Sequence, residues 1–166
     1  MVKQLLPSQA LSRAESLCSA AEYCSFDIRR KLTSWGVTGT DAEAILSKLI
    51  SARYIDDSRY AEAFVRDKVR FAHWGRNKVA FSLRRKCISD DIISRALALI
   101  ADDELSSGME MVMRGKLRTL KYKDAYDARN KLLRFGVSRG FDFGSLSSLV
   151  AKLVREIDSD ADVDDF

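Results

Sequence analysis

Three stretches of this sequence repeat one hydrophobic pattern at a spacing of about fifty residues. The first pattern recurs at a constant offset of 51 and then, less closely, at a further offset of 53. Apolar residues within each stretch fall at helical spacing. A period of this length built from helices is typical of a repeat array. The matched positions are Ile28, Leu32, Gly36, Val37, Ile45 and Leu49; Val79, Leu83, Cys87, Ile88, Ala96 and Ile100; and Leu132, Gly136, Gly140, Phe141, Leu149 and Leu153.

The repeated pattern predicts an all-α fold. The chain has one proline, Pro7, and few prolines favour helices because proline interrupts them. We expect an elongated, curved array of three tandem three-helix repeats, because units this small bury apolar surface by stacking on their neighbours. The predicted parts are a flexible lead-in at residues 1–9, repeats at residues 10–55, 56–101 and 102–157, and an acidic tail at residues 158–166.

Helix starts are predicted where a side chain can accept hydrogen bonds from unpaired first-turn amides. Gly136 lies inside a predicted helix, where glycine costs up to ~1 kcal/mol relative to alanine, so we expect a close contact or a bend there. The predicted caps are Ser8 or Ser12, Ser25, and Thr40 or Asp41 in the first repeat, and Asp56 or Asp57 and Ser89 or Asp90 in the second.

The helix predicted after residue 56 is amphipathic and basic. With Asp56 as its cap, Ile55 and Tyr60 occupy the two positions of a hydrophobic staple. One face is apolar and the others carry basic residues, a pattern that a core helix with a solvated rim explains without any function. The apolar positions are Tyr60, Ala61, Phe64, Val65, Val69 and Ala72, and the basic ones are Arg59, Arg66, Lys68 and Arg70.

Charge is distributed unevenly along the chain. The net charge is +4, but residues 156–166 hold six acids and no base, so residues 1–155 carry +10. A basic body with an acidic tail predicts a polyanionic partner, or a surface for which the tail competes. Ordinary solubilising charge explains the same balance, and a disordered tail that serves only solubility explains the C-terminal acids.

The composition argues against an enzyme, a metal site and a cofactor. The sequence has one histidine, His73, no C-x-x-C pair and no glycine-rich phosphate loop. We interpret Cys18, Cys24 and Cys87 as reduced, mostly packed thiols, and the adjacent Asp56 and Asp57 as capping residues rather than a catalytic pair. The start of the chain predicts no signal peptide and no stretch predicts a membrane span, so we expect a cytoplasmic protein that binds no membrane.

The run Y-I-D-D-S-R-Y-A-E-A-F-V-R at residues 54–66 resembles the signature of the RecX family, bacterial regulators of the recombinase RecA. Other parts of the chain fit further elements of that family, namely residues 27–32, residues 138–142 and the positions of Val79, Leu83, Lys86 and Ile88. Arg53, Cys87 and Gly136 depart from it, since the family usually has glycine at the first position, often at the second, and an apolar residue at the third. The signature residues, mainly structural, are Tyr54, Ile55, Asp56, Asp57, Arg59, Tyr60, Ala61, Phe64 and Gly75.

The resemblance implies a non-enzymatic protein that binds the RecA filament on single-stranded DNA. Family members lie along the helical groove of that filament and suppress its ATPase, strand-exchange and coprotease activities. We accordingly expect a monomer, without a cofactor, that binds the filament and touches DNA, if at all, within it. An array of repeats suits this role, because each added contact with a polymer raises the effective concentration for the next.

Two basic clusters are the candidate partner-binding residues. Basic surfaces attract phosphates and release counterions, although a solvated face is the alternative interpretation of both clusters. We expect the following residues to contact RecA or DNA phosphate: Arg66, Lys68, Arg70, Arg76, Lys78, Arg84, Arg85 and Lys86 in the first cluster, and Arg114, Lys116, Arg118, Lys121, Lys123, Arg134 and Arg139 in the second, which also contains Arg129 and Lys131.

Aromatic residues are interleaved with the first cluster. Phe71, Trp74 and Phe81 lie among its bases. An exposed aromatic side chain there can stack on an unpaired base. The alternative is that Trp74 and Phe81 belong to the core.

A stand-alone helical DNA-binding protein is the rival interpretation. Three short helices with a glycine turn, as in residues 30–49, resemble a helix-turn-helix unit. A duplex reader needs polar base-contacting residues early in the third helix, where this chain has Asp41 and Glu43, and Asp90 and Asp91 in the second copy. Carboxylates there would be repelled by phosphates, so a generic basic single-strand binder is the better form of this alternative.

Overall fold

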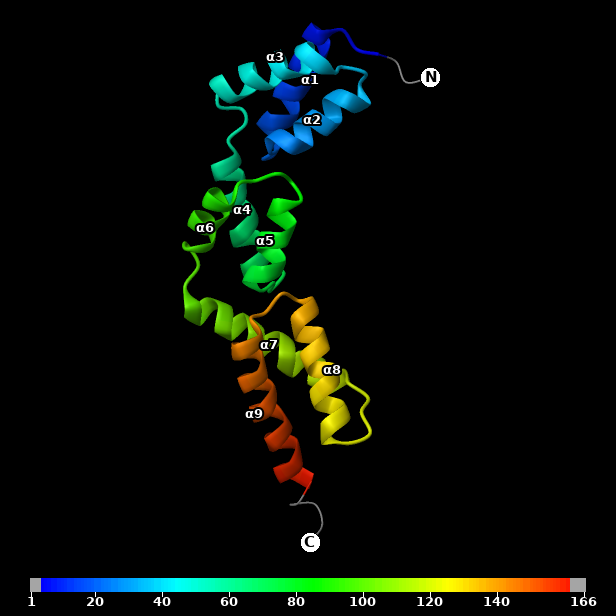
Figure 1. The fold of residues 1–166 in the computed structure, drawn as a ribbon, viewed down its shortest axis with the longest axis vertical. Coiled ribbons are helices and arrows are strands. Elements are labelled where there is room, and N and C mark those ends of the chain that lie inside the picture. Colours follow the sequence, from blue (N-terminus) through cyan, green and yellow to red (C-terminus); the bar gives the residue numbers. More distant parts are fainter. Residues whose placement is uncertain (1–3, 162–166) are drawn as a thin grey trace. The chain divides into compact units, whose positions relative to one another are not determined.

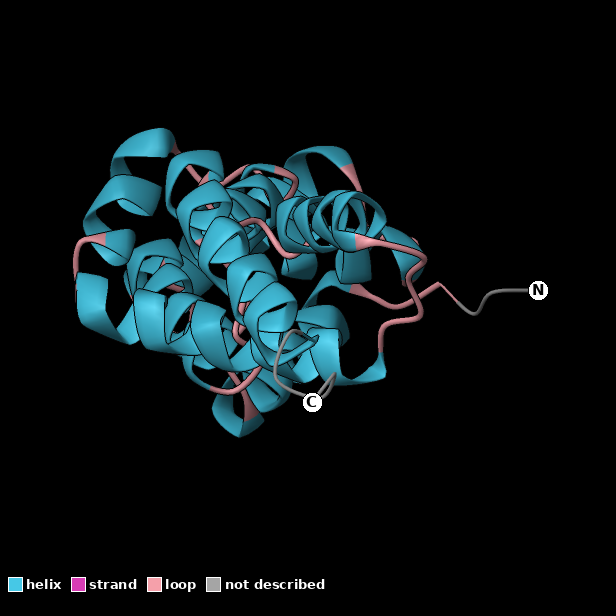
Figure 2. Cartoon of the chain, turned by 90° about the horizontal axis from the view of Figure 1, so that it is seen from below, coloured by secondary structure: helices cyan, strands magenta, loops and turns pink. Residues whose placement is uncertain are grey.

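The structure, a computed structural model, describes residues 4–161, and side chains to residue 157. Within these residues the chain forms nine α-helices and no strand, which confirms the predicted all-α class (Figures 1 and 2). The helices are α1 (Pro7–Ala20), α2 (Ser25–Ser34), α3 (Gly39–Ser51), α4 (Asp57–Arg70), α5 (Arg76–Arg84), α6 (Asp90–Leu97), α7 (Asp102–Thr119), α8 (Ala125–Ser138) and α9 (Phe143–Ala161).

The chain divides into two compact units. Unit 1 comprises residues 1–64 and 83–96, and unit 2 comprises residues 65–82 and 97–166. In unit 1, α1, α2 and α3 enclose a core that includes Ile28, Leu32 and Leu49. In unit 2, α7, α8 and α9 lie against one another around Met113 and Leu132 (Figure 1). The boundaries of the predicted repeats and the elongated, curved arrangement stay predictions.

The repeated positions of the sequence have one structural role. All of them are buried except Gly36 and Leu149, which are partly exposed, and Cys87, which is exposed. Gly36, Cys87 and Gly140 each end the middle helix of their repeat in the left-handed region, with φ of 79°, 58° and 84°. The amide of the next residue then bonds the carbonyl five residues back, in the pairs Val37–Leu32, Ile88–Leu83 and Phe141–Gly136. This Schellman turn recurs three times.

Two of the departures from the family pattern fall on the same kind of turn. Cys87 and Arg53 stand where the family favours glycine, and both have positive φ, of 58° and 60°. The backbone therefore keeps the geometry that glycine adopts without strain, and the side chain is tolerated at a cost of about 1 kcal/mol.

Cys87→Gly is therefore expected to stabilise the protein by about 1 kcal/mol, because glycine relieves the strain of the left-handed turn. Urea unfolding followed by circular dichroism measures the change. Cys87→Ala is the matched control, since it removes the thiol but keeps a Cβ at φ 58°. Equal stability of the two variants would show that the turn stores no such strain.

Several helix starts differ from prediction. α1 begins at Pro7, inside the predicted flexible lead-in, and Leu5 N donates to Trp35 O at 3.0 Å. Neither Ser8 nor Ser12 caps it. Its first position suits proline, which needs no amide partner there. Ser25 is the first residue of α2 rather than its cap, and α3 begins at Gly39, before Thr40.

Other local predictions are confirmed. Asp56 caps α4, because its Oδ1 accepts from the amides of Ser58 and Arg59, each at 3.0 Å. Gly136 lies where a Cβ would come within 2.3 Å of the Leu146 side chain, which is the close contact expected there. The backbone of α9 runs to Ala161, into the predicted acidic tail, and residues 162–166 lie outside the described part of the chain.

Candidate partner-binding site

Several of the family signature residues make contacts inside unit 1. The carboxylate of Asp57 does not cap α4 but accepts from the amide of Ser25, the first residue of α2, at 2.8 Å. Arg59 pairs with Glu22 at 2.6 Å and also donates to the carbonyls of Arg53 and Tyr54. These side chains bond to other residues of unit 1, and the mainly structural role expected of the signature stays a prediction.

Lys86 and Asp27 form the main charged contact of unit 1. Lys86 Nζ lies 2.7 Å from each carboxylate oxygen of Asp27, and it lies over the ring of Tyr60 at 5.6 Å from the centroid. Cys24 Sγ donates to Asp27 Oδ2 at 3.3 Å. The two charged side chains are only 27% and 21% exposed. We call Cys24, Asp27, Tyr60 and Lys86 the Asp27–Lys86 cluster.

The cluster shifts the titration of its members. Burial, the largest single influence, lowers the pKa of Lys86, but the hydrogen bonds that the lysine donates to Asp27, together with its interactions with Tyr60, outweigh burial and raise that pKa. Burial raises the pKa of the Cys24 thiol to about 12 and also raises the pKa of Tyr60. Lys86 is therefore charged and internally bonded at neutral pH, which makes it a poor candidate for contacting a partner.

Arg139 has a corresponding position in unit 2. It lies 53 residues after Lys86, also just before the left-handed turn, and donates to the carbonyl of Ala72 in the turn that follows α4. Nearby, Arg76 pairs with Asp102 at 3.0 Å. Arg70 pairs with Glu104 at 2.7 Å. In both units the residue before the turn binds an earlier part of the chain, Asp27 in the case of Lys86 and Ala72 in the case of Arg139.

Most other candidate cations also have partners within their own unit. Arg114 lies between Glu110 and Glu156, at 2.9 and 2.8 Å, and those hydrogen bonds raise its pKa. Arg84 pairs with Asp90 at 2.6 Å, and Lys116 lies over the Phe135 ring. Exposed ion pairs of this kind stabilise by less than about 1 kcal/mol, so a partner can displace them.

A subset of the candidates is exposed and makes no hydrogen bond or ion pair through its side chain within residues 4–157. In unit 1 this subset contains Arg85. In unit 2 it contains Arg118, Lys121, Lys123 and Arg134, which lie at the end of α7, in the following loop and in α8. Arg129 of α8, a base of the second cluster that is not among the fifteen candidates, is exposed and unpaired in the same sense. Binding by any of the fifteen candidates stays a prediction, but these side chains are the readiest to meet an external anion.

The interleaved aromatics are not all core residues. Phe71 and Phe81 are 81% and 61% exposed. Trp74 is half-buried, and Lys68 and Lys78 lie over its ring at 5.6 and 4.4 Å from the centroid. Sequence reasoning did not single out Tyr122 and Tyr126, which are 39% and 75% exposed beside the free cations of unit 2. The position of Tyr122 between Lys121 and Lys123 was the available signal for that residue.

Neither a metal-binding group of side chains nor a membrane-spanning helix is found among the described residues. No group of three or more His, Cys, Asp or Glu side chains in that part is placed to hold a metal ion. None of the helices described is long and apolar enough to cross a membrane. Over the described residues, the fold and the surface define an all-helical protein whose notable chemistry is exposed positive charge.

Comparisons with known proteins agree with this class. The family model "RecX, second three-helix domain" matches residues 56–97. A protein of Clostridium perfringens (strain 13 / Type A) named "Regulatory protein RecX" is 32% identical over 132 residues, 78% of this chain and 61% of that protein. A protein of the same name from Vibrio campbellii is 29% identical over 147 residues, 87% of this chain and 93% of that protein.

A solved structure shows the same fold. The crystal structure of RecX from Lactobacillus salivarius superposes with a TM-score of 0.76 at 22% identity, covering 89% of this chain and 96% of that chain. The chain belongs to the RecX family, a family of regulatory proteins. It spans about three fifths (61%) of the length of the clostridial relative it matches.

Proposed function

We propose that this chain binds the RecA filament on single-stranded DNA, in its helical groove, and inhibits its ATPase, strand-exchange and coprotease activities. The observation that carries the proposal is membership of the RecX family, whose curated relatives are named as regulatory proteins. The protein acts in DNA repair, recombination and the SOS response by binding rather than by catalysis, and it works in the cytoplasm as a monomer.

The distribution of charge supports this role. Exposed cations with no partner within residues 4–157 occur in both units, so a polymer of repeated acidic or phosphate-bearing surfaces can be contacted at more than one point. Contacts at several points slow dissociation, because a released contact re-forms before the others break. Inhibition at substoichiometric amounts of the protein follows, since one bound molecule then affects a whole stretch of filament.

The test is the single-stranded-DNA-dependent ATPase of the host RecA, with this protein titrated at substoichiometric amounts. Strong loss of ATPase activity with weak binding to DNA alone supports the proposal. No effect on RecA, together with salt-sensitive binding to DNA alone, would favour the alternative of a stand-alone DNA-binding protein acting through its basic surface.

Arg85→Glu is expected to weaken inhibition of the RecA ATPase several-fold, because it reverses an exposed charge that has no partner among the side chains described. Lys48→Glu is the matched control, since Lys48 is an exposed, unpaired cation of α3 in the same unit and outside both clusters. Equal potency of the two folded variants would remove Arg85 from the binding surface. Lys86→Glu is not suitable for this purpose, because it disrupts the Asp27–Lys86 cluster.

A further inference from the structure

The segment that joins α7 to α8 concentrates positive charge. Residues 118–131 hold five Lys or Arg and two Asp, a net charge of +3. Both carboxylates are already engaged. Asp124 caps α8 by accepting from the amide of Asp127 at 2.8 Å, and Asp127 accepts from Lys131 Nζ at 2.8 Å. The remaining positive charge is therefore available to a ligand.

Internal hydrogen bonds fix the backbone of this segment. Lys131 Nζ also donates to the carbonyl of Lys121 at 2.8 Å, and the amide of Lys123 donates to Asp127 Oδ2 at 3.1 Å. These contacts tie the loop to the first turns of α8 through its main chain. The side chains of Lys121 and Lys123 are left exposed. A loop held in this way presents its side chains to a ligand at little cost in conformational entropy.

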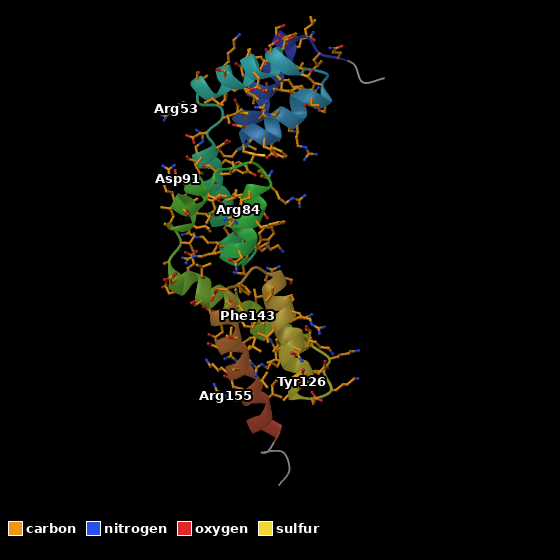
Figure 3. All side chains as sticks on the ribbon, viewed as in Figure 1. Arg53, Arg84, Asp91, Tyr126, Phe143 and Arg155 are labelled. Carbon is orange, nitrogen blue, oxygen red and sulfur yellow. The ribbon has the colours of Figure 1, made fainter. Side chains whose placement is uncertain are left out.

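Two tyrosines lie among these cations. Tyr122 is in the loop, and Tyr126 lies at the start of α8, beside the loop (Figure 3). They are 39% and 75% exposed, so their rings are accessible. We define the α7–α8 surface as Arg118, Lys121, Tyr122, Lys123, Tyr126 and Arg129. Aromatic rings between uncommitted cations are the features with which proteins bind single-stranded nucleic acid, where rings stack on bases and cations follow the phosphates.

Phe71, another exposed aromatic residue, has different surroundings. Around Phe71, neighbouring cations are committed: Arg70 pairs with Glu104, and Lys68 pairs with Asp67 and lies over the ring of Trp74. A phosphate there has to displace existing partners. At the α7–α8 surface a phosphate has no such partners to displace among the described residues. Counterion release and stacking therefore both favour binding at that surface.

We infer that the α7–α8 surface binds single-stranded nucleic acid, with an unpaired base stacked on Tyr126 or Tyr122 and the adjacent phosphates on Lys121 and Lys123. The inference rests on the proposed function only in identifying the strand inside the RecA filament as the ligand in the cell. An acidic protein surface is the alternative partner, and its binding would depend on Lys121 and Lys123 but not on the rings of Tyr122 and Tyr126.

The test is a fluorescence-anisotropy titration of the full chain against labelled oligothymidylate, with oligouridylate and duplex DNA as further arms and polyglutamate as competitor. The variants are Tyr122→Ala with Tyr126→Ala, and Lys121→Glu with Lys123→Glu. Lys48→Glu with Arg30→Glu is the charge-matched control on unit 1. Circular dichroism verifies that each variant is folded. The assay contains no recombinase, so its failure is distinguishable from failure of RecA regulation.

We expect the tyrosine variant to bind single strands at least about tenfold more weakly, since each stacked base contributes about 1–3 kcal/mol. The lysine variant should reduce the slope of log K against log salt concentration by about 2, and the control should retain both affinity and slope. A preference for oligothymidylate over oligouridylate would identify DNA as the ligand, and equal affinity would indicate recognition of the shared chemistry. Unchanged affinity of the tyrosine variant, with polyglutamate competing as well as the oligonucleotide, would overturn the inference in favour of an acidic partner.

Discussion

Gly75→Ala is expected to destabilise unit 2 by about 3 kcal/mol. A Cβ at Gly75 would lie 2.1 Å from the carbonyl oxygen of Gly140 and 2.4 Å from the amide nitrogen of Phe141. Both are backbone atoms of the turn that ends α8, so no rotamer change can relieve the clash. The same crossing carries two hydrogen bonds, Gly75 N to Arg139 O at 2.8 Å and Asn77 N to Gly140 O at 3.1 Å.

Urea unfolding in a Trp35→Phe background measures this loss, because Trp74, the remaining tryptophan, reports on unit 2. Gly115→Ala is the control. Gly115 also lies in unit 2, but inside α7 with no atom within 4 Å of an added Cβ, so alanine should stabilise by about 0.5–1 kcal/mol. Similar effects of the two substitutions would mean that the backbones do not cross as closely as described.

Lys86→Met is the second substitution with a large expected effect, a loss of about 1–3 kcal/mol in the free energy of unfolding of unit 1. The loss is smaller than for a fully buried ion pair, because the side chains of Lys86 and Asp27 are 27% and 21% exposed to water. The substitution keeps the aliphatic stem and leaves Asp27 without its cation beside the Cys24 thiol. Urea unfolding in a Trp74→Phe background, read from Trp35, measures it.

The pairing itself is tested by a double-mutant cycle with Asp27→Asn. If the two charges stabilise each other, the double variant loses less stability than the two single variants together, with a coupling of about 1 kcal/mol. Additive losses would place the contribution of Lys86 in its contact with Tyr60 instead. Lys131→Met serves as the comparison, because its pair with Asp127 is more exposed and should matter less.

Much of the fold was predictable, because the repeat constrains it. The constant offset aligns Leu32, Leu83 and Gly136 as the carbonyl positions of three equivalent turns, and the structure shows that turn in each copy. Helix starts were less predictable. α1 begins at Pro7, with Leu6 as its cap residue, because proline supplies the required φ without any capping side chain. The prediction of helix starts from capping side chains therefore missed the start of α1.

The sequence predicted which basic residues are candidates for the site, but it did not predict which of them are exposed and which are paired with a carboxylate of the same protein. Counting bases cannot distinguish Lys86, which is bonded to Asp27 across 59 residues of sequence, from Arg85 beside it, which is exposed. Only the fold determines which carboxylates lie within reach of which cations. For the same reason Tyr126 was not singled out, because its exposure depends on which side of α8 faces α7 and α9.

Cys87 gives the protein a natural attachment point for a chemical label. It is exposed, whereas Cys18 is half-buried and Cys24 is buried with a thiol pKa raised to about 12. A maleimide dye at neutral pH should therefore modify Cys87 selectively, without any engineered cysteine. The label would sit next to Lys86 and Arg85, so its fluorescence would report in real time whether that end of α5 becomes covered when a filament is added.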